Sequence, residues 1–198
     1  NVIDEIKAII ESDMSLTECN KTQNMHRDIV SAVKKIQSFG FQVQGGFILG
    51  FDSDTNLIFD NIIKTIQQSG VVVAMVGLLN APKGTSLYKR LKNENRLMDI
   101  PTGDNTDCSI NFKPKMDMQQ LISGYQRVVK TIYSQKYYYK RVKIFLENYN
   151  LPNKTRNKVH YRDITTFFRS LWRIGIIEKG QIHYWMLFFW SLRKPKRF

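Results

Sequence analysis

The chain has 198 residues, of which 42% are hydrophobic and 12% aromatic. This composition excludes a disordered or low-complexity chain and leaves enough apolar surface for one sizeable core. Lys and Arg outnumber Asp and Glu by 30 to 17, and the resulting net charge of +13 predicts a polyanionic partner or an anionic surface.

The positive charge is concentrated in the second part of the chain. Residues 1–112 carry 11 basic and 13 acidic side chains, whereas residues 113–198 carry 19 basic and 4 acidic ones. A shift this sharp predicts two regions with different roles, divided near residue 112.

The cysteine content and the lengths of the apolar runs indicate the cellular environment that we expect for the chain. Two cysteines far apart form no disulfide framework and predict a reducing, cytoplasmic environment. The longest apolar run, residues 184–190, is far shorter than the roughly 20 residues that span a bilayer. The chain starts at Asn1 rather than at Met, from which we expect a fragment of a longer protein.

The first region alternates helical and strand patterns. Apolar spacing and glycine stops predict helices over 1–10, 24–39, 55–69 and 85–94, and strands over 41–51 and 71–79. The order is typical of βαβ units with a parallel sheet, in a partial barrel or an open doubly wound sheet. We expect the nearly continuous apolar strand 71–79 to be buried on both faces.

The second region carries only helical patterns. Helices are predicted over 117–133, 135–149, 164–177 and 181–192, with a polar, basic loop over 150–159. The predicted fold class is therefore α/β, with a full or partial barrel or an open sheet represented over 1–112 and an all-α, basic, aromatic-rich accessory domain over 113–198.

Two motifs lie where the predicted strands end. Gly46-Phe47-Ile48-Leu49-Gly50 ends in glycine before the helix over 55–69, and Asn80–Tyr88 forms a turn after the second strand. Glycine at the carboxyl end of a parallel strand admits a ligand, but it also serves tight packing. Both interpretations remain open on the residues alone.

Together these motifs resemble a known family. A Gly-x-Ile-x-Gly strand, a helix, an apolar strand and a Pro-x-Gly-Thr-x-Leu-Tyr turn look like the second half of a radical S-adenosylmethionine (SAM) barrel. This resemblance implies that residues 1–112 form half of a partial (β/α) barrel. Further stretches resemble the cobalamin-binding-domain type, which includes hopanoid-methylase-like enzymes. These stretches are Cys19–Asn24, Phe47–Thr55, Val73–Leu79, Asn105–Met116 and Arg169–Arg173.

The resemblance implies a reaction and its cofactors. In this family a 4Fe–4S cluster binds SAM and cleaves it reductively to a 5′-deoxyadenosyl radical, and methyl transfer is one outcome. The cluster is held by a Cys-x-x-x-Cys-x-x-Cys loop, which this sequence lacks. The cluster and cobalamin are thus implied only by resemblance, with their ligands in an N-terminal half that we expect as the partner of this chain.

The resemblance also assigns SAM contacts. The adenine would pass Gly46, Ile48 and Gly50 on one side and Leu79 and Asn80 on the other, and Glu11 would reach the ribose hydroxyls. We expect no catalytic or metal-ligating role for the scattered thiols and imidazoles, because none has a partner at ligand spacing. These are Cys19, Cys108, His26, His160 and His183.

The basic, aromatic C-terminal region allows three interpretations. It is a solvated helical cap on the barrel, an attachment to an anionic membrane surface or a lipid-like substrate, or, less favoured, a nucleic-acid binding surface. The alternative to an enzyme is therefore a non-enzymatic basic helical module, and membrane-peripheral localisation accompanies the second interpretation.

Overall fold

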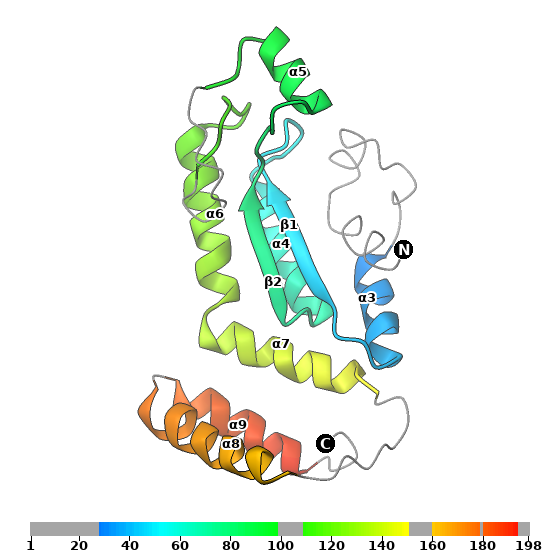
Figure 1. Cartoon of the computed structure of the whole chain (residues 1–198), viewed down its shortest axis with the longest axis vertical. Coiled ribbons are helices and arrows are strands. Elements are labelled where there is room, and N and C mark those ends of the chain that lie inside the picture. Colours follow the sequence, from blue (N-terminus) through cyan, green and yellow to red (C-terminus); the bar gives the residue numbers. More distant parts are fainter. Residues whose placement is uncertain (1–27, 99–108, 151–159, 179, 194–198) are drawn as a thin grey trace.

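A computed structural model describes residues 28–98, 109–150, 160–178 and 180–193. In these residues the chain is a mixed α/β protein, mostly helical, with two strands (Figure 1). The elements are α3 (Ile29–Ser38), β1 (Gln44–Leu49), α4 (Leu57–Ser69), β2 (Val73–Leu78), α5 (Ser86–Asn93), α6 (Met118–Ile132), α7 (Gln135–Asn148), α8 (Tyr161–Trp172), the π-helical turn η2 (Arg173–Ile177) and α9 (Gln181–Leu192). The predicted helix over 1–10 and the residue Glu11 lie outside the described ranges.

The two strands form a parallel pair with α4 as the crossover. The register runs from Gln44 opposite Val73 to Leu49 opposite Leu78. The βαβ unit expected from the sequence is therefore confirmed, and the described residues hold this one two-stranded sheet. The predicted half of a barrel is not shown by the described residues, because they contain two strands.

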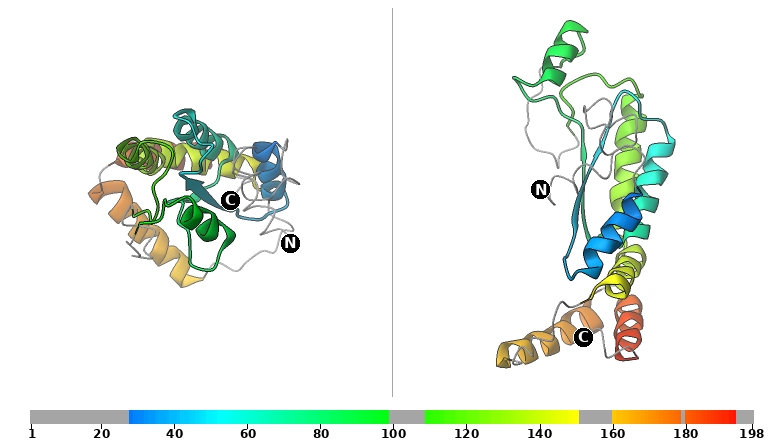
Figure 2. Two further views of the ribbon diagram at one scale, coloured as in Figure 1. Left: turned by 90° about the horizontal axis from the view of Figure 1, so that it is seen from above. Right: turned by 90° about the vertical axis from the view of Figure 1, so that its right-hand side faces the viewer.

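Among the described residues, helices cover one face of the sheet and leave the other face open. In Figure 2, α4 and α6 lie on the same side of the strands. Along β1 burial alternates strictly, with Phe47 and Leu49 buried and Ile48 exposed. The prediction that strand 71–79 is buried on both faces is wrong, since Val73 and Met75 on β2 are exposed. A run of apolar residues does not reveal by itself that one face of a strand lacks a covering layer.

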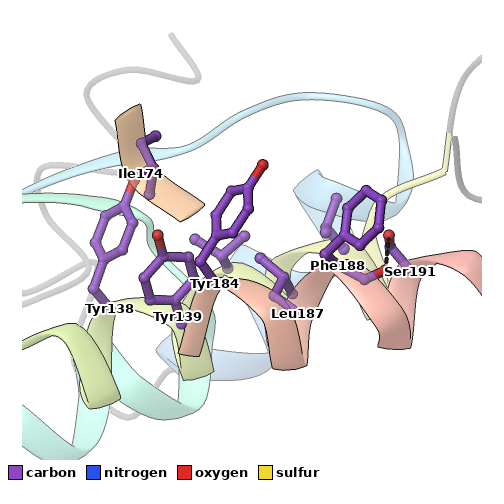
Figure 3. A pocket seen from close by; sticks show the side chains of 9 residues that line it. Tyr138, Tyr139, Ile174, Tyr184, Leu187, Phe188 and Ser191 are labelled. Atoms are coloured by element: carbon purple, nitrogen blue, oxygen red, sulfur yellow. Dashed lines mark hydrogen bonds between the residues drawn. The ribbon is translucent and has the colours of Figure 1, made fainter. Parts of the chain in front are cut away.

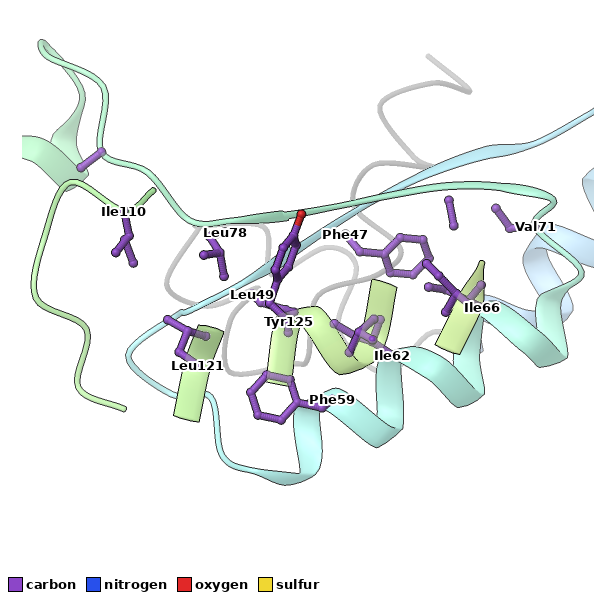
Figure 4. Packing of buried hydrophobic residues seen from close by; sticks show 14 of the residues in the cluster. Phe47, Leu49, Phe59, Ile62, Ile66, Val71, Leu78, Ile110, Leu121 and Tyr125 are labelled. Carbon is purple, nitrogen blue, oxygen red and sulfur yellow. The ribbon is translucent and has the colours of Figure 1, made fainter. Parts of the chain in front are cut away.

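The core lies between the covered face and the two long helices (Figure 4). Side chains from both strands meet three consecutive inward positions of α4 and the inner face of α6. The cluster includes Phe47, Leu49, Leu78, Phe59, Ile62, Ile66, Leu121, Tyr125 and Val128. Because α6 contributes to this core, the first helix of the basic region packs directly on the sheet. The division near residue 112 stays a prediction.

The helix ends follow the expected signals in most places. Asp117 accepts a hydrogen bond from Gln120 N at 2.9 Å, and Thr85 caps α5 through Tyr88 N at 3.2 Å. Gly70 ends α4 in the left-handed conformation that only glycine adopts without strain. The predicted helix over 164–177 instead begins at Tyr161 and changes to a π-helical turn after Trp172.

The C-terminal helices lie beyond the amino end of the sheet. In Figure 1, α7 crosses below the strands, and α8 and α9 lie on its far side. Tyr133 donates its hydroxyl proton to Ala74 O at 2.7 Å, which ties the corner between α6 and α7 to β2. None of the described helices is long and apolar enough to cross a bilayer.

Candidate functional site

The uncovered face of the sheet carries a strip of small and apolar groups. Gly46, Ile48 and Gly77 lie on this face in adjacent register, since Ile48 is paired with Gly77. A Cβ atom added at Gly46 or Gly77 would meet no atom within 4 Å. Ile48 is 43% exposed. Glycine leaves the backbone accessible here, so a flat ligand can lie directly against the strands.

The turn at the carboxyl end of β1 is fixed by one carboxylate. Asp54 Oδ2 accepts hydrogen bonds from Gly50 N at 2.8 Å and from Phe51 N at 3.0 Å. Gly50 has φ +104°, and its α-carbon faces Leu121 so closely that an added Cβ would lie 3.3 Å from Cδ2. The chain therefore leaves β1 in a conformation that requires glycine. Asp54 holds the turn rather than capping α4, whose N-cap is Asn56.

The end of β2 is held by a pair of asparagines. Asn80 Nδ2 donates to Ser109 O at 3.2 Å, and Asn80 Oδ1 accepts from Asn111 N at 3.1 Å. In return, Asn111 Oδ1 accepts from Ala81 N at 2.9 Å, and its Nδ2 donates to Ala81 O at 2.8 Å. Both polar groups of each amide are thus engaged, which positions the loop after β2 against residues 109–111.

A buried ion pair braces the same edge. Asp52, 6% exposed at its side chain, receives two hydrogen bonds from Arg96, with Nη1–Oδ2 at 2.9 Å and Nη2–Oδ1 at 2.6 Å. Arg90 lies 3.4 Å from the same carboxylate. The hydrogen bonds from Arg96 are the main reason that the pKa of Asp52 lies below its ordinary value. The reciprocal hydrogen bond raises the pKa of Arg96.

The structure brings the expected residues to one edge and one face of the sheet. Gly46 and Ile48 lie on the uncovered face, while Gly50, Leu79 and Asn80 lie at the carboxyl edge, where Leu79 N donates to Leu49 O at 2.8 Å. Their assigned contacts with SAM stay predictions. The polar atoms of Asn80 are occupied within the chain, so its side chain acts on the loop.

Sequence reasoning missed several residues of this face and edge. They are Gly77, a single glycine within an apolar strand, and the polar residues Asp52, Asp54, Arg96 and Asn111. Gly77 could have been identified from the sequence, because an isolated glycine in a strand often marks a position where another group approaches the backbone closely. The polar partners lie far apart in the sequence, 44 positions for Arg96 and Asp52 and 31 for Asn111 and Asn80, and only the fold pairs them.

The described residues do not supply a metal site. Across the placed parts of the chain, no group of three or more His, Cys, Asp or Glu side chains could hold a metal ion. His160 precedes α8, where its N–H donates to Asp163, and Cys19, Cys108 and His26 lie outside the described ranges. A set of side chains that could hold an iron–sulfur cluster is therefore not found among these residues.

Comparison with known proteins places the chain in a family. Residues 85–198 match the family described as Domain of unknown function (DUF4070), and the chain belongs to this family. The chain is 29% identical over 182 residues to an uncharacterized methyltransferase, sll1242, of Synechocystis sp., covering 90% of this chain and 34% of that protein.

Two further relatives are named by their reactions. The chain is 25% identical over 183 residues to the hopanoid C-2 methylase of Rhodopseudomonas palustris, covering 86% of this chain and 33% of the relative. It is 24% identical over 128 residues to the bacteriochlorophyllide d C-12(1)-methyltransferase of Chlorobaculum tepidum, covering 64% and 28%. The chain thus spans about a third of the length of these relatives, and no solved structure matches it.

The relatives confirm the resemblance derived from the motifs. The sequence resembles the hopanoid-methylase-like type of radical SAM protein, and a hopanoid methylase is among the matched relatives. The match to that relative extends over both the sheet and the basic helices, since it covers 86% of the chain.

Proposed function

We propose that this chain forms the adenosine side of the SAM site in a radical SAM methyltransferase. The observation that carries the proposal is the uncovered strip of Gly46, Ile48 and Gly77, which ends at a rigidly held carboxyl edge. In parallel α/β folds, ligands bind at this edge. The names of the three relatives, each a methylase or methyltransferase, support methyl transfer as the reaction class.

The described residues contribute binding and shape to this function. The planar adenine would lie against Ile48 and the bare backbone of the two glycines, where no Cβ atom intervenes. Gly50 and Leu79 would close the end of the strip, and Asn80 would hold the following loop. Glu11, which the family resemblance matches to a ribose contact, would bind the ribose hydroxyls of SAM in this proposal.

In this proposal, the electron that cleaves SAM and the carrier of the methyl group are provided by cofactors bound outside the described residues. When bound, an iron–sulfur cluster would provide the electron for reductive cleavage of SAM, and cobalamin would serve as the methyl carrier; the residues that hold both would lie outside the described part of this chain. The uncovered sheet face would then be the inner wall of a barrel, completed by the strands of a cluster-binding segment. The methyl acceptor in this proposal is a large, mainly apolar molecule, as the names of two relatives suggest.

Photo-cross-linking tests the proposed contacts with the chain itself. We expect an azido-adenine analogue of SAM to label β1 or β2, and excess S-adenosylhomocysteine to prevent the labelling. A Cβ atom at Gly46 meets no atom within 4 Å, so Gly46→Leu projects a side chain from the open strip and should reduce labelling by about tenfold, or ~1.4 kcal/mol of binding.

The matched control lies on the same face of the same strand. Gln44 is exposed at the amino end of β1, so Gln44→Leu adds a similar side chain away from the carboxyl edge and should leave labelling unchanged. Labelling confined to the C-terminal helices, or equal labelling of both variants, would refute the proposal.

A further inference from the structure

The helices α8 and α9 expose an apolar surface that the rest of the described chain does not use. On α8, Tyr161, Ile164, Phe168 and Trp172 follow one another at spacings of three and four residues, so they form one stripe. All four are exposed, and Phe168 and Trp172 are each 63% exposed. No residue of α8 is buried.

Arginines occupy the other side of α8. Arg162 and Arg169 are seven residues apart, on the arc that the apolar stripe leaves free, and Arg173 follows in η2. Arg173 pairs with Glu178 at 3.3 Å. A helix with aromatic and aliphatic residues along one side and arginines along the other is typical of helices that lie in a membrane interface.

The helix α9 has one face that packs toward α7 and one face that is exposed. Its inner side chains, Tyr184, Leu187, Phe188 and Ser191, line a cavity of about 390 Å³ against α7 (Figure 3). Its outer stripe consists of Ile182, Met186 and Phe189, all exposed. Residues 181–192 contain no charged side chain, so the outer stripe is apolar along its whole length.

The chemistry of this surface distinguishes among its candidate partners. Residues 160–198 carry eight basic and two acidic side chains, which complements an anionic surface. The exposed set includes the aliphatic residues Ile164, Ile176, Ile177, Ile182, Met186 and Leu192. Aliphatic side chains offer no stacking platform for bases, whereas they partition readily into the acyl region of a bilayer.

We propose that α8, η2 and α9 dock the protein peripherally on an anionic lipid surface. The apolar stripes would enter the boundary between headgroups and acyl chains, and the arginines would contact lipid phosphates. The docking surface lies at the amino end of the sheet, beyond α7, whereas the strip of Gly46 and Gly77 faces away from the helical layer (Figures 1 and 2). Docking would therefore leave the carboxyl edge of the sheet accessible.

The tryptophans make this proposal directly testable with the unmodified chain. All three tryptophans of the sequence, Trp172, Trp185 and Trp190, lie in α8 and α9. We expect vesicles of phosphatidylcholine with phosphatidylglycerol to shift their emission to the blue, and brominated acyl chains to quench it. Pure phosphatidylcholine should bind much more weakly, and added salt should weaken binding to the anionic vesicles.

Two variant pairs separate the apolar and the basic contributions. Ile164→Asp with Phe168→Asp should abolish vesicle binding, while Leu57→Asp, at an exposed apolar position of α4, should leave it unchanged. Arg162→Gln with Arg169→Gln should weaken binding to anionic vesicles by about tenfold or more. The charge-matched control, Lys64→Gln with Lys89→Gln on α4 and α5, should have a much smaller effect.

Several results would overturn the proposal. Equal binding to neutral and anionic vesicles would exclude the electrostatic component, and undiminished binding by the aspartate variant would exclude the apolar one. An emission shift with single-stranded RNA but not with vesicles would assign the surface to nucleic acid. A concentration-dependent dimer of the unaltered chain that the aspartate variant dissociates, without vesicle binding, would assign the surface to a second copy.

Discussion

Asp52 shows how one buried charge fixes the edge of the candidate site. Its carboxylate lies in the loop after β1, and Arg96 reaches it from the segment after α5 with two hydrogen bonds. Arg96 Nε also donates to Lys113 O at 2.8 Å, and its guanidinium lies 5.8 Å from the centre of the Phe112 ring. One side chain therefore joins the β1 loop to the residues that precede α6.

Removing Arg96 should destabilise the fold markedly. In an Arg96→Leu variant, Asp52 keeps a buried charge without its main partner, and breaking such a pair lowers the free energy of unfolding by about 3 kcal/mol. Urea denaturation measures the change. The control is Arg127→Leu, whose ion pair with Asp60 is exposed at both ends and should contribute about 0.5 kcal/mol. Equal losses in the two variants would contradict this assignment.

The same carboxylate should make stability depend on pH in the acid range. The pKa of folded Asp52 lies below its ordinary value of 3.8, chiefly because of the hydrogen bonds from Arg96. The unfolded chain therefore binds a proton more readily than the folded one. The stabilisation is fully present above the unfolded pKa and disappears as the pH falls through the folded pKa.

Comparison with Asp52→Asn isolates this contribution. The stability difference between the unaltered chain and the variant should be constant near neutral pH and shrink below about pH 4. Thermal unfolding across this range gives the profile. A difference that stays constant into the acid range would show that Asp52 titrates normally.

At the scale of elements, the contact between α4 and α6 depends on a missing side chain. Gly124 of α6 faces Phe59 of α4, and a Cβ added at this glycine would lie 2.2 Å from the ring. Alanine is favoured over glycine within a helix by about 1 kcal/mol, yet the clash is with a buried aromatic ring. Helix propensity and packing therefore act in opposite directions at one position.

Packing should prevail in a Gly124→Ala variant. We expect a net loss of about 2 kcal/mol of stability, because the Phe59 ring must leave its position. Adding Phe59→Leu should recover part of the loss, so the double variant should be more stable than additive losses predict. Chemical denaturation of all four members of the cycle tests this coupling. Gly46→Ala, at an open position, should change stability by less than about 1 kcal/mol.

The limits of the sequence prediction lie at this scale as well. The order of helices and strands was predictable, because apolar spacing and residues such as Thr85, Gly70 and Asp117 mark the elements locally. The uncovered face of the sheet was not, because burial depends on layers that a strand's own residues do not encode. The partners of Asp52 and Asn80 could not be predicted either, since they lie 44 and 31 positions away in the sequence, respectively.

On the scale of the whole molecule, α7 lies between the two parts for which we propose SAM binding and lipid docking. Its residues Ile144 and Phe145 pack against Gly70 at the end of α4, and it also lines the cavity shared with α9. Arg141 fixes the helix in this position. Its guanidinium is buried and donates to Ile132 O at the end of α6 and to Val72 O at 3.4 Å. Burial lowers the pKa of Arg141, but its donors satisfy carbonyls from two other elements.

Replacing Arg141 should loosen the docking surface without unfolding the core. Arg141→Met keeps much of the apolar volume but leaves two carbonyls without a donor, which lowers stability by about 2 kcal/mol. Since α9 packs against α7 as well as against η2, amide hydrogen exchange should accelerate in α7 and α9.

The expected exchange pattern is local, and a neighbour on the same helix supplies the control. Amides of α4, whose side chains lie in the core, should stay protected in Arg141→Met, because Ile62 and Ile66 remain packed against the sheet. Lys140 is exposed one position earlier, so Lys140→Met should leave the whole profile unchanged. Uniform acceleration across α4, α7 and α9 would mean that Arg141 supports the entire fold, whereas faster exchange confined to α7 and α9 would show that Arg141 holds the C-terminal helices to the sheet and its covering helices.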